Sequence, residues 1–151
     1  MRLRLYRAGD LPALLVLFYD TVHTVCAGDY TPAQLDAWAP KEREEAAWDA
    51  SLRSRTTLVA EEDGVLLGFG NIGSDGYLDL LYVHKDHQGR GVAAVLCNFL
   101  ETLYPVEKVT VHASETARPF FEKRGYRVLR PQQVERRGQV LTNYVMEKEL
   151  S

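Results

Sequence analysis

The sequence contains little cysteine and no long apolar run. Its two cysteines, Cys26 and Cys97, lie far apart in apolar stretches, and such a pair makes neither a disulfide framework nor a metal knuckle. We therefore expect two reduced, buried thiols in a cytoplasmic protein. No apolar run reaches the roughly 18 residues that span a bilayer. Residues 1–7 alternate basic and apolar side chains, unlike a signal peptide. We thus expect no membrane partner.

The sequence also lacks an excess of basic residues. Its 18 Lys and Arg are outnumbered by 21 Asp and Glu, so we expect no nucleic-acid partner, which would need a basic face. The charge is uneven: residues 10–63 hold 11 acids and 4 bases, whereas residues 118–137 hold 7 bases and 2 acids. The basic segment suits an anionic ligand and the acidic one a cationic ligand such as an amine. Ordinary solvated faces explain both segments equally well.

A length of 151 residues without repeats or linkers predicts one domain over residues 1–151. The hydrophobic period changes from helical to alternating near Thr56. The predicted strands are 2–7, 56–62, 65–71, 77–84, 108–112, 126–134 and 139–148, and the predicted helices are 11–26, 32–38, 42–53, 89–103 and 116–124. Because a helix separates strands 77–84 and 108–112, we expect these two to lie parallel through a right-handed crossover. The rest of the sheet is expected to be antiparallel, which makes the fold class α+β.

A strand, a turn with two glycines and an amphipathic helix follow one another at residues 80–96. The first turn of a helix leaves free N–H groups at the positive end of its dipole. Gly89 and Gly91 let an anion approach that backbone closely. The segment is not a Walker loop, and it lacks the third glycine of the dinucleotide fingerprint, whose position Ala94 occupies. The glycines alone predict a phosphate-binding turn no better than a turn without a ligand.

Two motifs favour the ligand. Residues 88–93, Gln-Gly-Arg-Gly-Val-Ala, fit the pattern Gln/Arg-x-x-Gly-x-Gly/Ala. Residues 113–126 are similar to a later stretch, Asn-x-x-Ala-x-x-aromatic-Tyr-x-x-x-Gly-Phe. Together these motifs resemble those of the GNAT acetyltransferase superfamily, in particular a bacterial group of N-acetyltransferases. The resemblance implies a mixed, mostly antiparallel sheet with splayed parallel central strands and four to five flanking helices. It also implies transfer of an acetyl group from acetyl-CoA to an amine on a small molecule, peptide or protein.

The resemblance further implies where acetyl-CoA lies. The pantetheine arm is expected between strands 79–83 and 108–112, on backbone groups of Leu81 and Val83, with the Val83 N–H polarising the thioester carbonyl. The pyrophosphate is expected on the N–H groups of residues 88–93. The implied cofactor-binding residues are Leu81, Tyr82, Val83, Gln88, Gly89, Arg90, Gly91, Val92, Ala93, Ser114, Phe120 and Phe121. A surface role for Arg90, and a core role for one of the two phenylalanines, remain alternatives.

Phe121 stands where many relatives carry the tyrosine that protonates the departing thiolate. A phenyl ring donates no proton, and a thiolate of pKa roughly 8.5 needs only modest help. Ser114, Tyr126 and Tyr144 are the candidate donors, with a helix cap or core packing as the alternative for each. Solvent is a further possibility.

Asp79 is the candidate base, expected on the same strand face as Leu81 and Val83 because it lies four residues before Val83. His84 and His112, at the ends of the two splayed strands, are alternative bases. His23 and Tyr144 are expected to contact the acceptor.

Two functions from different classes fit these residues. One is an N-acetyltransferase that works by direct attack in a ternary complex. The other is a catalytically idle acyl-CoA-binding or sensing module, which the missing hydroxyl at Phe121 favours. No metal is expected, because His84-x-x-His87 has no third ligand nearby. A homodimer is compatible with both functions, and the sequence does not identify the acceptor.

Overall fold

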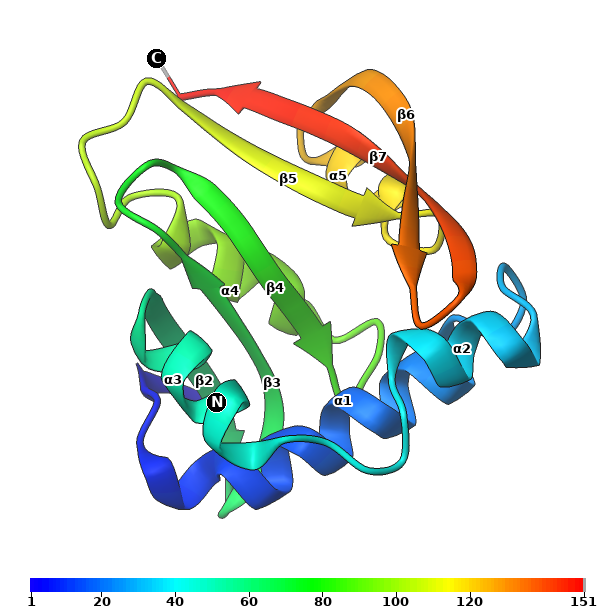
Figure 1. Ribbon diagram of the computed structural model, residues 1–151. Helices are drawn as coiled ribbons and strands as arrows, with labels where there is room; N and C mark the ends of the chain where they lie inside the picture. Colours follow the sequence, from blue (N-terminus) through cyan, green and yellow to red (C-terminus); the bar gives the residue numbers. More distant parts are fainter. Residues whose placement is uncertain (151) are drawn as a thin grey trace.

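The computed structural model describes residues 1–150 and contains one seven-stranded sheet, in the order β1-β2-β3-β4-β5-β7-β6 (Figure 1). The strands are β1 (Arg2–Leu5), β2 (Thr56–Glu62), β3 (Val65–Ile72), β4 (Tyr77–Val83), β5 (Lys108–Ser114), β6 (Arg127–Arg136) and β7 (Gln139–Glu149). The helices are α1 (Leu11–Val25), α2 (Pro32–Trp38), α3 (Glu45–Arg53), α4 (Val92–Leu100) and α5 (Arg118–Lys123), with a 3-10 turn η1 (Ala8–Asp10) before α1. Only β4 and β5 pair in parallel. The predicted α+β class is confirmed.

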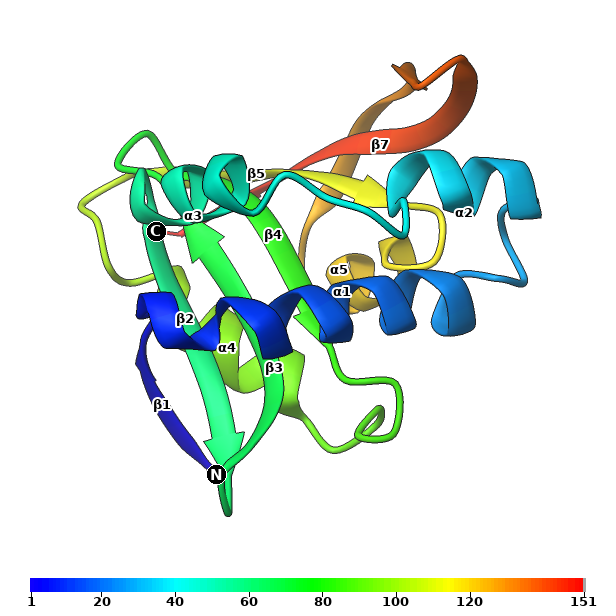
Figure 2. The same ribbon diagram turned by 60° about the horizontal axis from the view of Figure 1, so that its bottom comes forward.

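Helices cover both faces of the sheet (Figure 2). On one face, Leu14 and Phe18 of α1 join Leu35 of α2 and Leu52 of α3 in one buried cluster. On the other face, the apolar side of α4 and Phe121 of α5 form a second cluster. The periodic apolar residues that predicted these helices are thus the ones that they bury. No helix within residues 1–150 is long and apolar enough to cross a membrane.

The helix predicted at 89–103 is shorter at both ends. Gly89 and Gly91 have positive φ angles of 74° and 79°, so the chain reaches a helical conformation only at Val92. Residues 101–103 form turns after Leu100. The glycines therefore form the turn that precedes α4 rather than its first residues.

A one-residue register shift separates the two ends of β4. Leu80 pairs with Asn71, and Leu78 pairs with Ile72, so Asp79 is the extra residue of a β-bulge. The Asn71 side-chain oxygen accepts the Leu80 N–H at 3.0 Å. The shift reverses the alternation of side chains: Leu78 and Leu81 pack against the cluster under α4, whereas Leu80 packs against the cluster under α1. The expectation that Asp79 shares a face with Leu81 and Val83 was wrong for this reason.

Candidate active site

Strands β4 and β5 part after two residue pairs. The pairing joins Tyr77 to Thr110 and Leu78 to Val111 and extends no further, and the two ribbons diverge from there (Figure 1). The His84 N–H bonds to the Leu67 carbonyl of β3 at 2.8 Å. Because a strand alternates its backbone bonds, the N–H and C=O groups of Leu81 and Val83 face the open side. The predicted splay of the central strands is confirmed.

A cavity of about 530 Å³ occupies the space between the strands. Eight of the twelve residues expected to bind the cofactor line it: Leu81, Tyr82, Val83, Gln88, Ala93, Ser114, Phe120 and Phe121. Of these, Ser114 is also a candidate for catalysis. The cavity thus runs from the turn before α4 to the start of α5.

The turn before α4 exposes backbone N–H groups that no side chain covers. A Cβ atom at Gly89 or Gly91 would meet nothing within 4 Å, so this backbone is open to solvent. No side chain caps α4, and its first intrahelical bond runs from the Val95 N–H to the Gly91 carbonyl at 3.0 Å. The N–H groups of residues 92–94 therefore remain free at the positive end of the dipole. These features fit a pyrophosphate group.

The carbonyl of Val83 is already occupied. It accepts hydrogen bonds from the Thr21 hydroxyl at 2.8 Å and from the Gln88 side-chain amide at 2.7 Å. The Val83 N–H is therefore the group of this residue that stays available for a thioester carbonyl. Gln88 acts through this contact by tying the turn to the end of β4.

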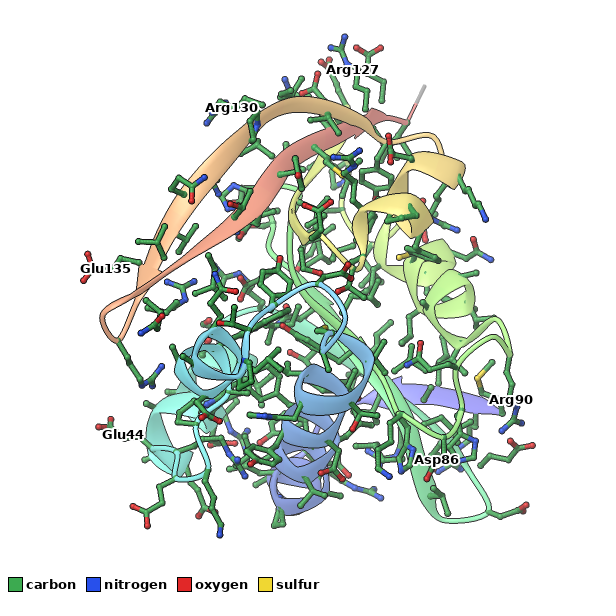
Figure 3. The ribbon with its side chains drawn as sticks, turned by 90° about the vertical axis from the view of Figure 1, so that its right-hand side faces the viewer. Glu44, Asp86, Arg90, Arg127, Arg130 and Glu135 are labelled. Carbon is green, nitrogen blue, oxygen red and sulfur yellow. The ribbon has the colours of Figure 1, made fainter. Side chains whose placement is uncertain are left out.

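Two of the residues expected to bind the cofactor, Tyr82 and Arg90, make contacts that the resemblance does not imply. The Tyr82 ring belongs to the face under α1, 5.0 Å from the Phe18 ring, so it lines the cavity from the side of α1. Arg90 is paired with Glu62 at 2.7 Å and lies on the outer side of the turn (Figure 3). Its charge is therefore partly neutralised before any phosphate binds.

The three candidate proton donors differ in whether their hydroxyl groups reach the cavity. Ser114 lines the cavity, and its Oγ accepts the Ala117 N–H at 3.1 Å, which leaves its own hydrogen free. The Tyr126 hydroxyl donates to Glu101 at 2.6 Å inside the core, away from the cavity lining. Burial and this carboxylate raise the pKa of Tyr126. The Tyr144 hydroxyl donates to Glu115 at 2.6 Å, also outside the lining. Only Ser114 of these three is brought to the site.

The candidate bases also differ in whether they line the cavity. Asp79 lines the cavity and pairs with Arg55 at 3.5 Å. His112 lines it too, and burial, followed by the charge of Arg130, lowers its pKa. His84 instead accepts the Asp86 N–H at 3.0 Å. His23 hydrogen-bonds to the Ala39 carbonyl at 2.8 Å and stacks on Tyr19, outside the cavity lining.

The comparisons with known proteins agree with this geometry. A family model described as an acetyltransferase (GNAT) domain matches residues 26–148. The chain belongs to the GNAT acetyltransferase family. An Escherichia coli (strain K12) protein described as uncharacterized N-acetyltransferase YafP is 35% identical over 147 residues, which cover 97% of this chain and 94% of that protein.

The fold of this chain is also similar to those of solved structures. A crystal structure from Rhodopseudomonas palustris, described as a GCN5-related N-acetyltransferase, has a TM-score of 0.95 at 37% identity and covers 99% of this chain and 95% of that one. A Salmonella typhimurium structure described as YncA with its cofactor acetyl-CoA has a TM-score of 0.74 at 17% identity, over 100% of this chain and 94% of that one, which shows the fold alone. GNAT acetyltransferases use acetyl-CoA, and this chain is an N-acetyltransferase of the EC 2.3.1 class.

Sequence reasoning missed several residues that line the cavity of this GNAT domain. Phe18, Trp38, Trp48 and Arg136 all line the cavity. They come from α1, α2, α3 and the end of β6, four elements that the family motifs do not cover. The helical spacing of apolar residues in α1 identified Phe18 as a core residue. The sequence gave no signal that Trp38, Trp48 or Arg136 would line a cavity.

Proposed function

We propose that this chain transfers the acetyl group of acetyl-CoA directly to a primary amine, with both substrates bound in the cavity between β4 and β5. The observation that carries the proposal is the two-pair ladder between these strands, which leaves the N–H groups of Leu81 and Val83 facing an open cavity. The cavity provides a groove for the thioester arm at one side and room for an amine at the other.

The chain's contribution to the reaction is mainly orientation. The free N–H groups at the start of α4 hold the pyrophosphate, and Leu81 holds the arm. The Val83 N–H donates to the thioester oxygen, where negative charge develops during attack. The C–N bond forms as the C–S bond breaks, so the amine loses a proton and the thiolate gains one.

In this proposal Ser114 donates a hydrogen bond to the departing thiolate and relays a proton to it from water, so that the serine ends as a neutral hydroxyl. Its hydroxyl lines the cavity and has a free hydrogen, whereas Phe121 and Tyr126 offer none there. A thiolate of pKa roughly 8.5 is a good leaving group, so a relay of this kind is sufficient.

Asp79 accepts the proton of the amine, directly or through water. Two observations support this role: Asp79 lines the cavity, and the β-bulge at Asp79 separates it from the face of Leu81 and Val83. His112 is the rival base, because its lowered pKa keeps the imidazole neutral near pH 7.

A covalent route through cysteine has less support. Cys26 lines the cavity, but burial raises its pKa to about 11. The thiol is therefore protonated near neutral pH and is a poor nucleophile. The free, buried state of Cys26 and Cys97 also supports our expectation of a cytoplasmic enzyme.

The test is thiol release from acetyl-CoA across a panel of small amines, peptides and lysine-containing proteins, with product mass as the second readout. Acetylated amine in stoichiometric amount with released CoA is the expected result. Tight binding of acetyl-CoA by calorimetry without turnover on any amine would instead favour the idle acyl-CoA-binding module.

A further inference from the structure

The acceptor half of the cavity is walled by aromatic rings. The Phe18 ring lies 4.9 Å from the Trp48 ring and 5.0 Å from the Tyr82 ring, centroid to centroid. The Trp38 N–H donates to the Tyr82 hydroxyl at 3.3 Å, and the Trp38 ring lies 5.3 Å from Tyr30. All five residues line the cavity. A wall of this kind binds a flat apolar group well, because rings pack on rings with little loss of side-chain freedom.

The same half of the cavity carries one uncompensated positive charge. Asp79 is balanced by Arg55 at 3.5 Å, and the lowered pKa of His112 leaves that ring neutral near pH 7. Arg136 lines the cavity and, within residues 1–150, has no carboxylate within 4.0 Å. A group of negative charge on the acceptor would be attracted there.

Asp79, Tyr77 and Arg136 all line the cavity. The charges of Asp79 and Arg136 both reach the Tyr77 hydroxyl: burial first and Asp79 next raise the pKa of Tyr77, and Arg55 and Arg136 lower it. The cavity lining thus offers an acceptor both a carboxylate and a guanidinium group, which are of opposite charge.

We propose that the acceptor is an aromatic α-amino acid, with its carboxylate on Arg136 and its ring on the wall formed by Phe18, Trp48 and Tyr82. This inference rests on the proposed function and names its substrate class. The α-amine is the nucleophile, and it becomes an amide as the thioester is cleaved.

The experiment compares four acceptors under one set of conditions: tryptophan, tryptamine, tryptophan amide and glycine. Tryptamine and the amide keep the ring and lose the carboxylate, whereas glycine keeps the carboxylate and loses the ring. The expected kcat/KM for tryptophan exceeds that for each of the other three by roughly tenfold or more.

Arg136→Gln is the decisive variant. It should lower kcat/KM for tryptophan by about tenfold and leave tryptamine within about twofold, so that the ratio between them falls towards one. Arg127→Gln is the matched control, because Arg127 lies on the same strand (Figure 3), is exposed, lies outside the cavity lining and pairs with Glu147. Trp48→Leu should lower the preference for tryptophan over glycine.

The outcomes distinguish the two levels of the proposal. Acetylation of tryptamine or of peptides at the same rate as tryptophan, unchanged by Arg136→Gln, overturns the amino-acid inference and leaves the proposed function intact. Equal effects of Arg136→Gln and Arg127→Gln on the tryptophan-to-tryptamine ratio also overturn it. No turnover with any amine, despite binding of acetyl-CoA, overturns both the amino-acid inference and the proposed function.

Discussion

The hydroxyl of Thr21, on α1, donates a hydrogen bond to the carbonyl of Val83, at the end of β4, at 2.8 Å. This contact joins α1 to the strand residue whose N–H we propose to donate to the thioester. Thr21 is 5% exposed, so the bond is shielded from water. It sets the position of α1 relative to the strand that orients the donor.

Thr21→Val keeps the volume of the side chain and removes this bond. We expect a loss of about 1 kcal/mol in the free energy of unfolding and a fall in kcat of about fivefold, because the end of β4 is held less firmly. Thr24→Val is the control, since Thr24 is on the same helix and exposed. Urea unfolding and steady-state kinetics provide the two readouts, and identical kinetics for both variants would argue against a positioning role for Thr21.

Gly91→Glu tests the anion site. Gly91 and Gly64 share nearly the same conformation, with φ of 79° and 78°, and both have open space where a Cβ would lie. Gly64→Glu therefore carries the same backbone strain of roughly 1–2 kcal/mol in the turn between β2 and β3, outside the cavity lining. We expect only Gly91→Glu to weaken CoA binding by about hundredfold, because it brings a carboxylate to the pyrophosphate. Calorimetric titration with CoA checks this, and equal affinities for the two variants would contradict the site.

Ser114→Ala tests the proton donor. We expect kcat to fall roughly tenfold, at the low end for a general acid, because the thiolate leaves readily. Adding Phe121→Tyr restores a hydroxyl at a ring that lines the cavity and should recover most of the loss. Phe121→Tyr alone should change kcat little. If the double variant stays as slow as Ser114→Ala, the serine acts in another way.

Asp79→Asn should lower turnover most at pH values below the pKa of the acceptor amine, where the acceptor arrives as an ammonium ion and needs a base. The affinity for acetyl-CoA should not change, because Asp79 lies on the acceptor side of the bulge. The pH dependence of kcat/KM gives the answer. His112→Gln is the comparison: a flattened profile in that variant, with a wild-type profile in Asp79→Asn, would transfer the role to His112.

The charge of Glu101 makes the free energy of unfolding depend on pH. Burial opposes its ionisation, but hydrogen bonds from Arg124 at 2.8 Å and Tyr126 at 2.6 Å outweigh burial and hold its pKa below the ordinary 4.5. A carboxyl with a lowered pKa in the folded state stabilises the fold above its unfolded pKa and loses that contribution as pH falls through the folded value.

Glu101→Gln should therefore cost about 3 kcal/mol of unfolding free energy at pH 7, and the gap from the wild type should narrow as pH falls below 4.5. Glu122→Gln removes a partner from the exposed pair with Arg118 and should cost under about 0.5 kcal/mol. Urea titrations at pH 7 and at pH 3.5 measure both. A gap that is constant across this range would mean that Glu101 stabilises the fold independently of its charge.

Much of the fold could be predicted because local signals and tertiary packing agree. The capping box at Thr31 and Gln34 forms as expected, with both reciprocal hydrogen bonds present. The turn at Asp63-Gly64 joins β2 and β3. The glycine turn before α4 keeps its N–H groups free, as the motif predicted, and that these groups bind an anion stays a prediction.

The catalytic side was harder to predict because long-range contacts decide it. A single extra residue at Asp79, held by the Asn71 side chain, reversed which face the carboxylate occupies. Tyr126 lies close in sequence to the cofactor motif, yet its hydroxyl is bound by Glu101, 25 residues away. No periodicity in the sequence reports either contact.

The brief ladder between β4 and β5 has a consequence for the unfolding of the free protein. Strands β1 to β4 and strands β5 to β7 are each extensively bonded, but they meet through two residue pairs. One apolar cluster nevertheless contains buried residues from both groups of strands, so a single unfolding transition is expected on heating. Since CoA would bridge the two strands where their backbone ladder is missing, saturating CoA should raise the temperature of that transition.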